Sequence, residues 1–421
     1  MNHPHGGLRI DGDRLMRRIT ELAAIGSIDG GGSSRLALTD EDREGRDLVA
    51  TWMYDLGLEV RIDGIGNVVA TRAGRIDGPA VMTGSHIDTV RSGGRYDGNL
   101  GVLAGLEAIE TLIDAGVETQ HPMAVAFFTD EEGARFPPDM LGSLVYVGGL
   151  GLEEALDIEG IDGSIVGDEL DRIGYRGTNP CPGPAPRAFV ELHIEQGPVL
   201  EAEGHAIGAV TGVQGISWTE FTITGQANHA GTTPMVLRHD AGYAAAALAT
   251  HVRDIATMME GRQVATVGRL DLQPNLVNVV AGKAILTVDL RNTDEALLLA
   301  AEADLTTFVD GLADAEGVKV ETRTLARFEP VVFNDSVVET VARTAERLGH
   351  SVSRMPSGAG HDAQMMARVC PTGMVFVPSR DGISHNPAEH TDPEDLVAGG
   401  DVLLQTLLAL DHDALDEGET T

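Results

Sequence analysis

The stretch GSHIDTVRSGGRYDGN, residues 84–99, decides the fold of this 421-residue chain. A strand-like apolar run leads into it and a helical pattern follows, so histidine and aspartate fall where a buried strand ends. FFTDEEGARF (127–136) and ELHIEQGP (191–198) repeat this arrangement, and GISHNPAEHT (382–391) adds a late histidine. Strand ends that present carboxylates and imidazoles together are typical of a divalent-metal site.

The segment between the first two motifs indicates the type of sheet. Residues 101–116 have the spacing of a helix with small and apolar residues on one face, and the apolar run 122–128 follows. The order strand, helix, strand predicts a parallel sheet with crossover helices. In such sheets functional residues collect beyond the carboxyl ends of the strands, which is where His86 and the Glu131–Glu132 pair fall.

The chain changes character near residue 212, where alternating runs typical of half-buried antiparallel strands begin. We therefore expect an α/β protein with a catalytic domain of residues 1–211 and 329–421, built on a mixed, mostly parallel sheet flanked by helices. Residues 212–328 are expected to form an inserted α+β lid or dimerisation domain. A Gly- and Pro-rich region, 159–188, is expected to be a long surface loop.

The composition narrows the range of partners. The chain carries 65 acidic against 30 basic residues, a formal net charge of −35. Nucleic acid and anionic membranes need a cationic surface, so both are disfavoured as partners. No apolar run reaches the roughly 20 residues of a membrane-spanning helix, and the N-terminal residues lack the apolar core of a secretory signal. We expect a cytoplasmic enzyme.

The first motif supplies two ligand candidates and a supporting residue. His86 and Asp88 are two positions apart at a strand end and point the same way. The Asp88 carboxylate is therefore predicted to hold the ring nitrogen of His86 that does not bind metal. Asp97 lies on the Gly-rich loop that follows, where nearby glycines allow a close approach to a metal ion.

The later motifs supply the remaining candidate metal ligands. Adjacent buried carboxylates are costly unless cations neutralise them, although a solvated turn is the alternative explanation for Glu131 and Glu132. Successive side chains diverge at a strand end, so one carboxylate can bind metal while its neighbour faces the substrate water. With His193 and His385 added, and Asp97 shared, the ligands suffice for two divalent ions about 3.5–4 Å apart.

At this point a family resemblance becomes specific, and it covers nearly the whole chain. The sequence resembles the dinuclear-metal amidohydrolases related to aminoacylases and carboxypeptidases, in particular their hydantoinase/carbamoylase branch. Carboxypeptidase-like relatives usually have aspartate where this chain has His193. Further segments that match the branch are GQANHAGTTPM (225–235), NLVNVV (275–280), DLRNTD (289–294) and SGAGHDAQMM (357–366).

The resemblance implies a role for each ligand. His86 and His193 would bind one ion, Glu132 and His385 the other, and Asp97 would bridge them. Zn²⁺ is the first choice of metal, with Mn²⁺, Co²⁺ or Ni²⁺ as alternatives. Glu131 would be the general base that moves a proton from the attacking water to the leaving nitrogen. The resemblance also makes Asp97–Gly98 a candidate for a cis peptide bond.

The resemblance further implies a substrate site shared between the two domains. Arg291 would clamp the substrate carboxylate with its planar guanidinium. His229 would donate to the reacting carbonyl oxygen from the opposite subunit of a homodimer formed through the inserted domain. Further hydrogen bonds would come from Gln196, Asn278, Gly358 and Gly360.

The function implied is hydrolysis of the ureido C–N bond of an N-carbamoyl-L-amino acid, which yields an amino acid, carbon dioxide and ammonia. Allantoate amidohydrolase and β-ureidopropionase are the alternatives within the branch. A dipeptidase or N-acyl amino-acid hydrolase is disfavoured by His193 and its HIEQGP context. A metal-free binding protein on the same fold is disfavoured by the intact ligand set and by Glu131.

Overall fold

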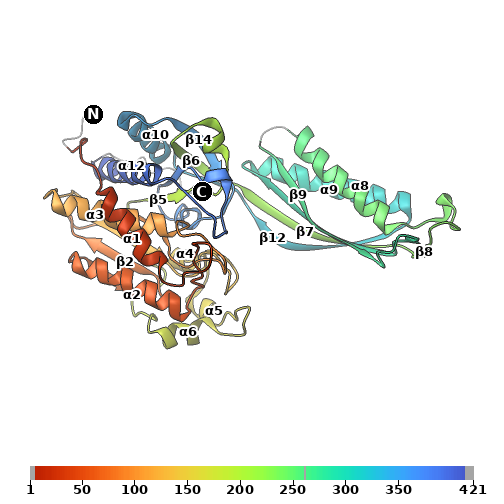
Figure 1. Ribbon diagram of the computed structural model, residues 1–421, viewed down its shortest axis with the longest axis horizontal. Helices are drawn as coiled ribbons and strands as arrows, with labels where there is room; N and C mark the ends of the chain where they lie inside the picture. The colour runs from red at the N-terminus through yellow and green to blue at the C-terminus, as the bar shows by residue number, and fades with distance from the viewer. Residues whose placement is uncertain (1–4, 260–261, 413–421) are drawn as a thin grey trace. The chain divides into compact units, whose positions relative to one another are not determined.

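The computed structural model describes residues 5–259 and 262–412 and divides the chain into two compact units (Figure 1). The first unit contains the residues up to Gly212 and those from Val332 onward, and the second comprises Val213–Val331. The sequence analysis expects these boundaries between residues 211 and 212 and between residues 328 and 329.

The first unit is built on a nine-stranded mixed sheet. Along its main path the strands follow the order β1-β2-β4-β3-β5-β15-β6-β13, and β14 pairs with β6. The central strands β4, β3, β5 and β15 are parallel, while β1, β2 and β6 pair antiparallel with their neighbours. This arrangement confirms the predicted α/β class. The strands are β1 (Glu59–Ile62), β2 (Val68–Arg72), β3 (Val81–His86), β4 (Met123–Phe128), β5 (Ala188–Ile194), β6 (Ile207–Val213), β13 (Val331–Val332), β14 (Val352–Ser357) and β15 (Thr372–Val377).

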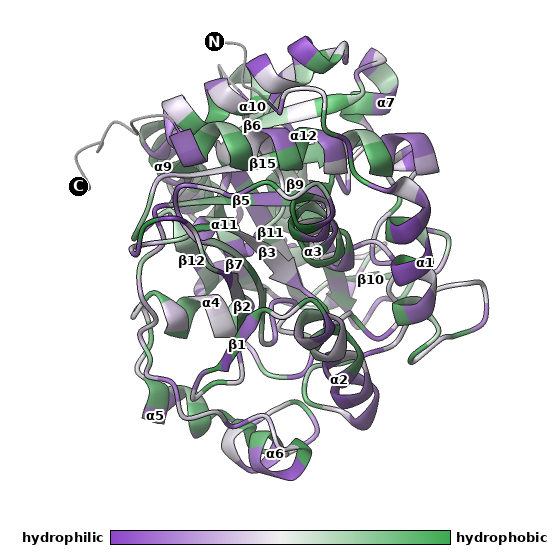
Figure 2. Ribbon diagram, turned by 90° about the vertical axis from the view of Figure 1, so that its left-hand side faces the viewer, coloured by the Kyte–Doolittle hydropathy of each residue, from purple (hydrophilic) through white to green (hydrophobic). Residues whose placement is uncertain are grey.

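Helices cover both faces of this sheet, which explains why the central strands are buried at every position rather than at alternate ones (Figure 2). On one face α3 (Asn99–Asp114) and α12 (Pro393–His412) pack together against the strands. The short helices α4 (Leu141–Tyr146) and α11 (Asp362–Met366) pack together on the other. Gly399 permits the close approach of α12, since an added Cβ would lie only 2.6 Å from a Val377 methyl carbon.

The remaining helices lie around this core. One of them corrects the expectation of a long loop over 159–188, because Val166–Ile173 forms a helix that buries Val166, Leu170 and Ile173. No helix in the described ranges 5–259 and 262–412 is long and apolar enough to cross a membrane. The remaining helices of the first unit are α1 (Gly12–Ala23), α2 (Asp40–Asp55), α5 (Leu152–Leu156), α6 (Val166–Ile173), α7 (Val199–Glu203), α10 (Asp335–Leu348) and the 3₁₀ turn η2 (Arg380–Gly382).

The sheet opens a crevice between β3 and β5. Their pairing ends at Thr83–Val190, yet β3 continues to His86 and β5 continues past His193. β3 is followed in the chain by β4, which lies on one side of it in the sheet. β5 lies on the other side of β3, and β15 lies beyond β5. Strand order therefore reverses at this point, and in open α/β sheets such a reversal places the ligand site beyond the carboxyl ends of the strands.

The second unit is a four-stranded antiparallel sheet with two helices on one face. Strand β11 shows strict alternation, and its buried residues Ala284, Leu286, Val288 and Leu290 form a core with the helices. Strand order is β12-β7-β11-β9, and a separate short pair joins β8 to β10. The elements are β7 (Gly215–Thr224), β8 (Asn228–His229), η1 (Met235–Leu237), α8 (Ala241–Met258), β9 (Val264–Gln273), β10 (Val279–Val280), β11 (Lys283–Asn292), α9 (Glu295–Glu316) and β12 (Lys319–Phe328).

Candidate metal centre and active site

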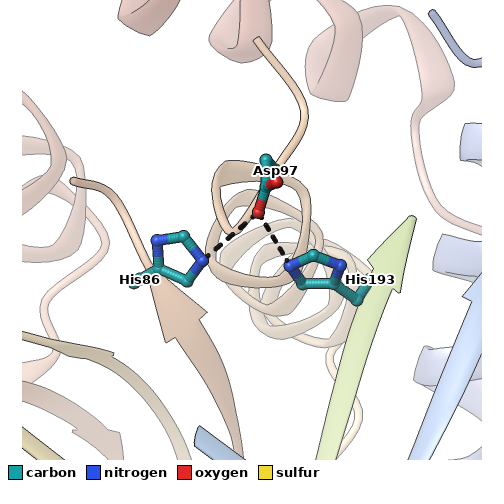
Figure 3. Close-up of side chains that lie close together, drawn as sticks. All are labelled: His86, Asp97 and His193. Atoms are coloured by element: carbon teal, nitrogen blue, oxygen red, sulfur yellow. Dashed lines mark ion pairs between the residues drawn. The ribbon is translucent and has the colours of Figure 1, made fainter. Parts of the chain in front are cut away.

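The crevice brings a first group of predicted ligands together. His86 ends β3, His193 lies near the end of β5, and Asp97 is in the loop before α3. Asp97 Oδ1 lies 3.4 Å from His86 Nε2 and 3.2 Å from His193 Nε2 (Figure 3). All three side chains are buried. Their atoms converge closely enough for one metal ion.

A second group uses the other oxygen of the same aspartate. Asp97 Oδ2 lies 3.5 Å from His385 Nε2, and His385 Nε2 lies 3.2 Å from Glu132 Oε2. Glu132 follows β4, and His385 lies in the loop after η2. Because each oxygen of Asp97 faces a different group, this carboxylate has the geometry of a bridge between two cations.

Main-chain carbonyls orient the two buried imidazoles. Nδ1 of His86 lies 2.9 Å from the Asp88 carbonyl oxygen, and Nδ1 of His193 lies 2.8 Å from that of Ile194. A donor hydrogen bond from each Nδ1 fixes the tautomer in which Nε2 offers its lone pair to a metal. Both Nε2 atoms are therefore presented toward Asp97.

Asp88 supports the site differently from the sequence-based prediction. Its carboxylate lies 3.9 Å from His86 Nδ1, beyond hydrogen-bonding distance, so the prediction that this carboxylate holds the ring was wrong. The ring contacts the Asp88 carbonyl because the chain turns directly after β3. The carboxylate instead accepts the backbone N–H groups of Glu131 and Glu132, each at 3.3 Å.

Gly98 allows the chain to pass close to His86. It has φ +64°, and an added Cβ would lie 2.4 Å from the His86 ring. Its N–H donates to His193 Nε2 at 3.1 Å, so the loop is held between the two imidazoles. The expected cis bond at Asp97–Gly98 was wrong: among the described residues the cis peptide bonds precede Pro138, Pro182 and Pro274.

Glu131, the predicted general base, lies beside the first group of ligand candidates. It is buried, and its Oε2 lies 3.4 Å from His86 Nε2. Burial raises the pKa of its carboxyl well above the ordinary value, and the neighbouring carboxylates of Asp362 and Glu132 add to the rise against the opposing effect of His86. A carboxylate whose proton affinity is raised in this way is suited to accept a proton from water.

The charge balance of the cluster fits divalent cations. The ion-pairing hydrogen bond with Glu132 raises the pKa of His385 to about 9. Burial lowers the pKa of His86, but the negative charges of Glu131, Asp97 and Asp88 raise it by more. The pKa of His86 therefore lies well above its ordinary value. The carboxylates thus attract positive charge. Protons on the imidazoles or metal ions can supply it, and mixed imidazole and carboxylate donors suit Zn²⁺, Mn²⁺, Co²⁺ or Ni²⁺.

A cavity of about 120 Å³ lies over this cluster. Gln196 and Gly360, two of the predicted substrate-binding residues, line it beside the ligands, and Gly358 is two residues from Gly360. Gln196 Nε2 donates to Asp97 Oδ2 at 2.9 Å, while its Oε1 is buried and has no hydrogen-bond partner among the described residues. That oxygen therefore keeps its capacity to accept a hydrogen bond.

The predicted substrate-binding residues Asn278 and Arg291 lie in the second unit, as does His229, which was predicted to be catalytic. His229 and Asn278 are close together, since His229 pairs with Val279 and the Ala230 N–H donates to the Asn278 carbonyl oxygen at 2.9 Å. Arg291 lies on β11, where Asp289 pairs with its guanidinium at 3.0 Å and the Trp218 ring lies 5.9 Å from it. These contacts orient the guanidinium.

Two residues at the site, Asp139 and Glu389, received no role in the sequence analysis. Asp139 and His361 line the cavity, and the His361 ring centroid lies 4.6 Å from that of His193. Glu389 contacts the loop that carries Asp97. Glu389 lies in the same GISHNPAEHT stretch as His385, so an acidic residue in the motif of a predicted ligand was the available signal.

The comparisons agree with this geometry. The model of peptidase family M20/M25/M40 matches residues 82–409, and the chain belongs to this family of hydrolases. It is 42% identical over 409 residues to an N-carbamoyl-L-amino-acid amidohydrolase of Rhizobium meliloti, covering 97% of this chain and 98% of the relative. It is 37% identical over 396 residues to the allantoate amidohydrolase of Escherichia coli, covering 92% and 95%.

A solved structure extends the likeness to the whole fold. The hydantoinase/carbamoylase family amidase of Burkholderia multivorans superposes with a TM-score of 0.95 at 45% identity, covering 97% of this chain and 99% of that one. The resemblance to the hydantoinase/carbamoylase branch is confirmed.

Asp97→Ala should abolish binding at both metal positions, because Asp97 has an oxygen in each group. His193→Ala and His385→Ala should each weaken mainly one position. Elemental analysis of purified variants, with wild type as the reference, measures ions per chain. Equal losses in all three variants would indicate a single-metal site.

Proposed function

We propose that this chain is a dinuclear metal-dependent amidohydrolase that cleaves the ureido C–N bond of an N-carbamoyl-L-amino acid. The observation that carries the proposal is the pair of ligand groups joined by Asp97, with Glu131 beside them at the cavity. One ion would be held by His86 and His193, and the other by Glu132 and His385. Zn²⁺ is the first choice of metal.

The chain's residues divide the chemistry between them. Bound divalent ions would polarise the ureido carbonyl and lower the pKa of a water molecule. Glu131 takes the proton from that water and gives it to the leaving nitrogen. Addition of one water across the C–N bond releases the amino acid and carbamate, which separates into carbon dioxide and ammonia. Gln196 and the backbone from Gly358 to Gly360 orient the ureido group beside the ligands.

The second unit is proposed to bind the remainder of the substrate. Arg291 would pair with the substrate carboxylate, with its guanidinium held by Trp218 and Asp289. Asn278 would add a hydrogen bond, and His229 would donate to the carbonyl oxygen on which negative charge develops. We propose that this unit acts as a lid in each catalytic cycle.

We also propose that the protein is a homodimer formed through the second unit, with His229 donated to the partner's site. Next to the β8–β10 pair that carries His229 lie apolar side chains exposed by 59–104% of their surface. Exposed apolar patches of this kind typically mark protein interfaces. These side chains are Met235, Val236, Leu237, Leu276 and Val277.

The substrate is tested by ammonia release from a panel of N-carbamoyl-L-amino acids, N-carbamoyl-β-alanine, allantoate and a dipeptide. We expect the highest kcat/KM for an N-carbamoyl-L-amino acid, because the relative with that name has the higher identity of the two compared. Preference for allantoate would instead identify the chain as an allantoate amidohydrolase. Cleavage of the dipeptide alone would exclude ureido hydrolysis.

Glu131→Gln should reduce kcat by about 10²–10⁴, because it removes the general base and keeps the shape of the side chain. Folding and metal content should stay close to wild type. Kinetics and elemental analysis of the same preparation check this. A near-normal rate in the glutamine variant would remove Glu131 from the mechanism.

Mixing inactive His229→Ala and Glu131→Gln proteins should restore activity if His229 acts across the dimer. Random exchange would give up to about a quarter of wild-type activity, since each mixed dimer has one intact site. Glu131→Gln mixed with Asp97→Ala is the matched control, because both changes fall in the same unit and no intact site can form. No recovery under verified subunit exchange would mean that His229 acts within its own chain or not at all.

A further inference from the structure

Glu389 joins the two loops that carry the bridging aspartate and the late histidine. Its Oε1 accepts the backbone N–H groups of Tyr96 at 3.0 Å and Asp97 at 3.3 Å. Its Oε2 lies 3.2 Å from the hydroxyl of Ser384, the residue before His385. The side chain is only 5% exposed, so these contacts are made away from bulk water.

The same hydroxyl connects Glu389 to the ligand itself. Ser384 Oγ also lies 3.1 Å from Asp97 Oδ2, the oxygen that faces His385 and Glu132. Glu389 is therefore connected to Asp97 in two ways. It accepts the backbone N–H of Asp97 directly, and the Ser384 hydroxyl links it to the Asp97 carboxylate. Both contacts constrain where Oδ2 lies relative to His385.

The loop before Asp97 packs closely against the Glu389 side chain. A Cβ added at Gly94 would lie 2.0 Å from Glu389 Oε1 and 2.5 Å from Glu389 Cβ. Glycine at this position lets the loop before Asp97 close over the Glu389 side chain. The Glu389 backbone is fixed as well, because its N–H donates to the Asn386 carbonyl oxygen at 2.9 Å.

The two ligand groups differ in how much they depend on such contacts. His86 and His193 are on β3 and β5, whose positions the central sheet determines. His385 lies in a loop and has φ +51°, an uncommon backbone conformation for a residue with a side chain. A loop residue in that conformation is held only by the surrounding structure.

We propose that Glu389 is a positioning residue that sets the affinity of the second metal position by holding His385 and Asp97 Oδ2 at the spacing of one ion. This inference rests on the proposed dinuclear function and assigns Glu389 no contact with the ion or the substrate. Residues that support metal ligands from behind typically change metal affinity by about 10–100-fold when removed.

The test is titration of metal-free protein with Zn²⁺ against a chromophoric chelator, which resolves the two binding steps without an activity measurement. Glu389→Ala should weaken the second step by about 10–100-fold and leave the first nearly unchanged. Glu389→Gln should restore most of the affinity, because its amide oxygen can accept the two N–H groups and its NH₂ can donate to Ser384.

Asp411→Ala is the matched control. Asp411 is also a buried carboxylate that accepts two consecutive backbone N–H groups, those of Gln120 at 2.8 Å and His121 at 2.7 Å. These groups precede β4, at the opposite end of that strand from Glu131. This variant should bind both ions as wild type does, whatever its loss of thermal stability.

Distinct results would overturn the inference. Positioning by Glu389 would be contradicted if Glu389→Ala bound two ions with wild-type affinity. It would also be contradicted if Glu389→Ala and Glu389→Gln lost the same affinity in the second step, or if Asp411→Ala lost as much as Glu389→Ala. Should Glu389→Ala not fold, Ser384→Ala removes only the hydroxyl link and must still weaken the second step selectively. Binding of fewer than two ions by wild type would refute the proposed dinuclear function, and this inference with it.

Discussion

The carboxylate of Asp97 is the constraint on which the rest of the site depends. Its two oxygens lie 3.2–3.5 Å from three imidazole nitrogens that come from β3, β5 and the loop after η2. Residues far apart in the sequence must meet at one side chain for this to occur. The separation of β3 from β5 beyond Thr83–Val190 and the absence of a side chain at Gly98 make that meeting sterically possible.

Electrostatics explain why such a cluster requires cations. Taking a carboxylate out of water costs several kcal/mol, and the carboxylates of Asp97, Glu131 and Asp88 are all buried. Burial and like charges raise the pKa of Glu131, whereas neighbouring carboxylates raise the pKa values of His86 and His385. The same features that raise these pKa values make the cluster suited to bind divalent ions.

The residues that converge on Asp97 could be predicted because each falls at the end of an apolar strand or in a motif with several polar residues. The supporting contacts could not, since they depend on main-chain geometry. Asp88 was expected to act through its carboxylate and instead presents its carbonyl to His86. Glu389 acts on a loop almost 300 positions away in sequence, a relation that no local pattern reveals. The helix Val166–Ile173 was missed because glycines and prolines around it dominate the pattern.

The central claim is that Asp97 bridges two metal ions. It is tested most directly by a crystal structure of the Zn²⁺-loaded protein with anomalous diffraction recorded on both sides of the zinc absorption edge. The account predicts two anomalous peaks about 3.5–4 Å apart, one beside His86 and His193 and the other beside Glu132 and His385, with one Asp97 oxygen at each. A single peak, or two peaks of which only one contacts Asp97, would contradict it.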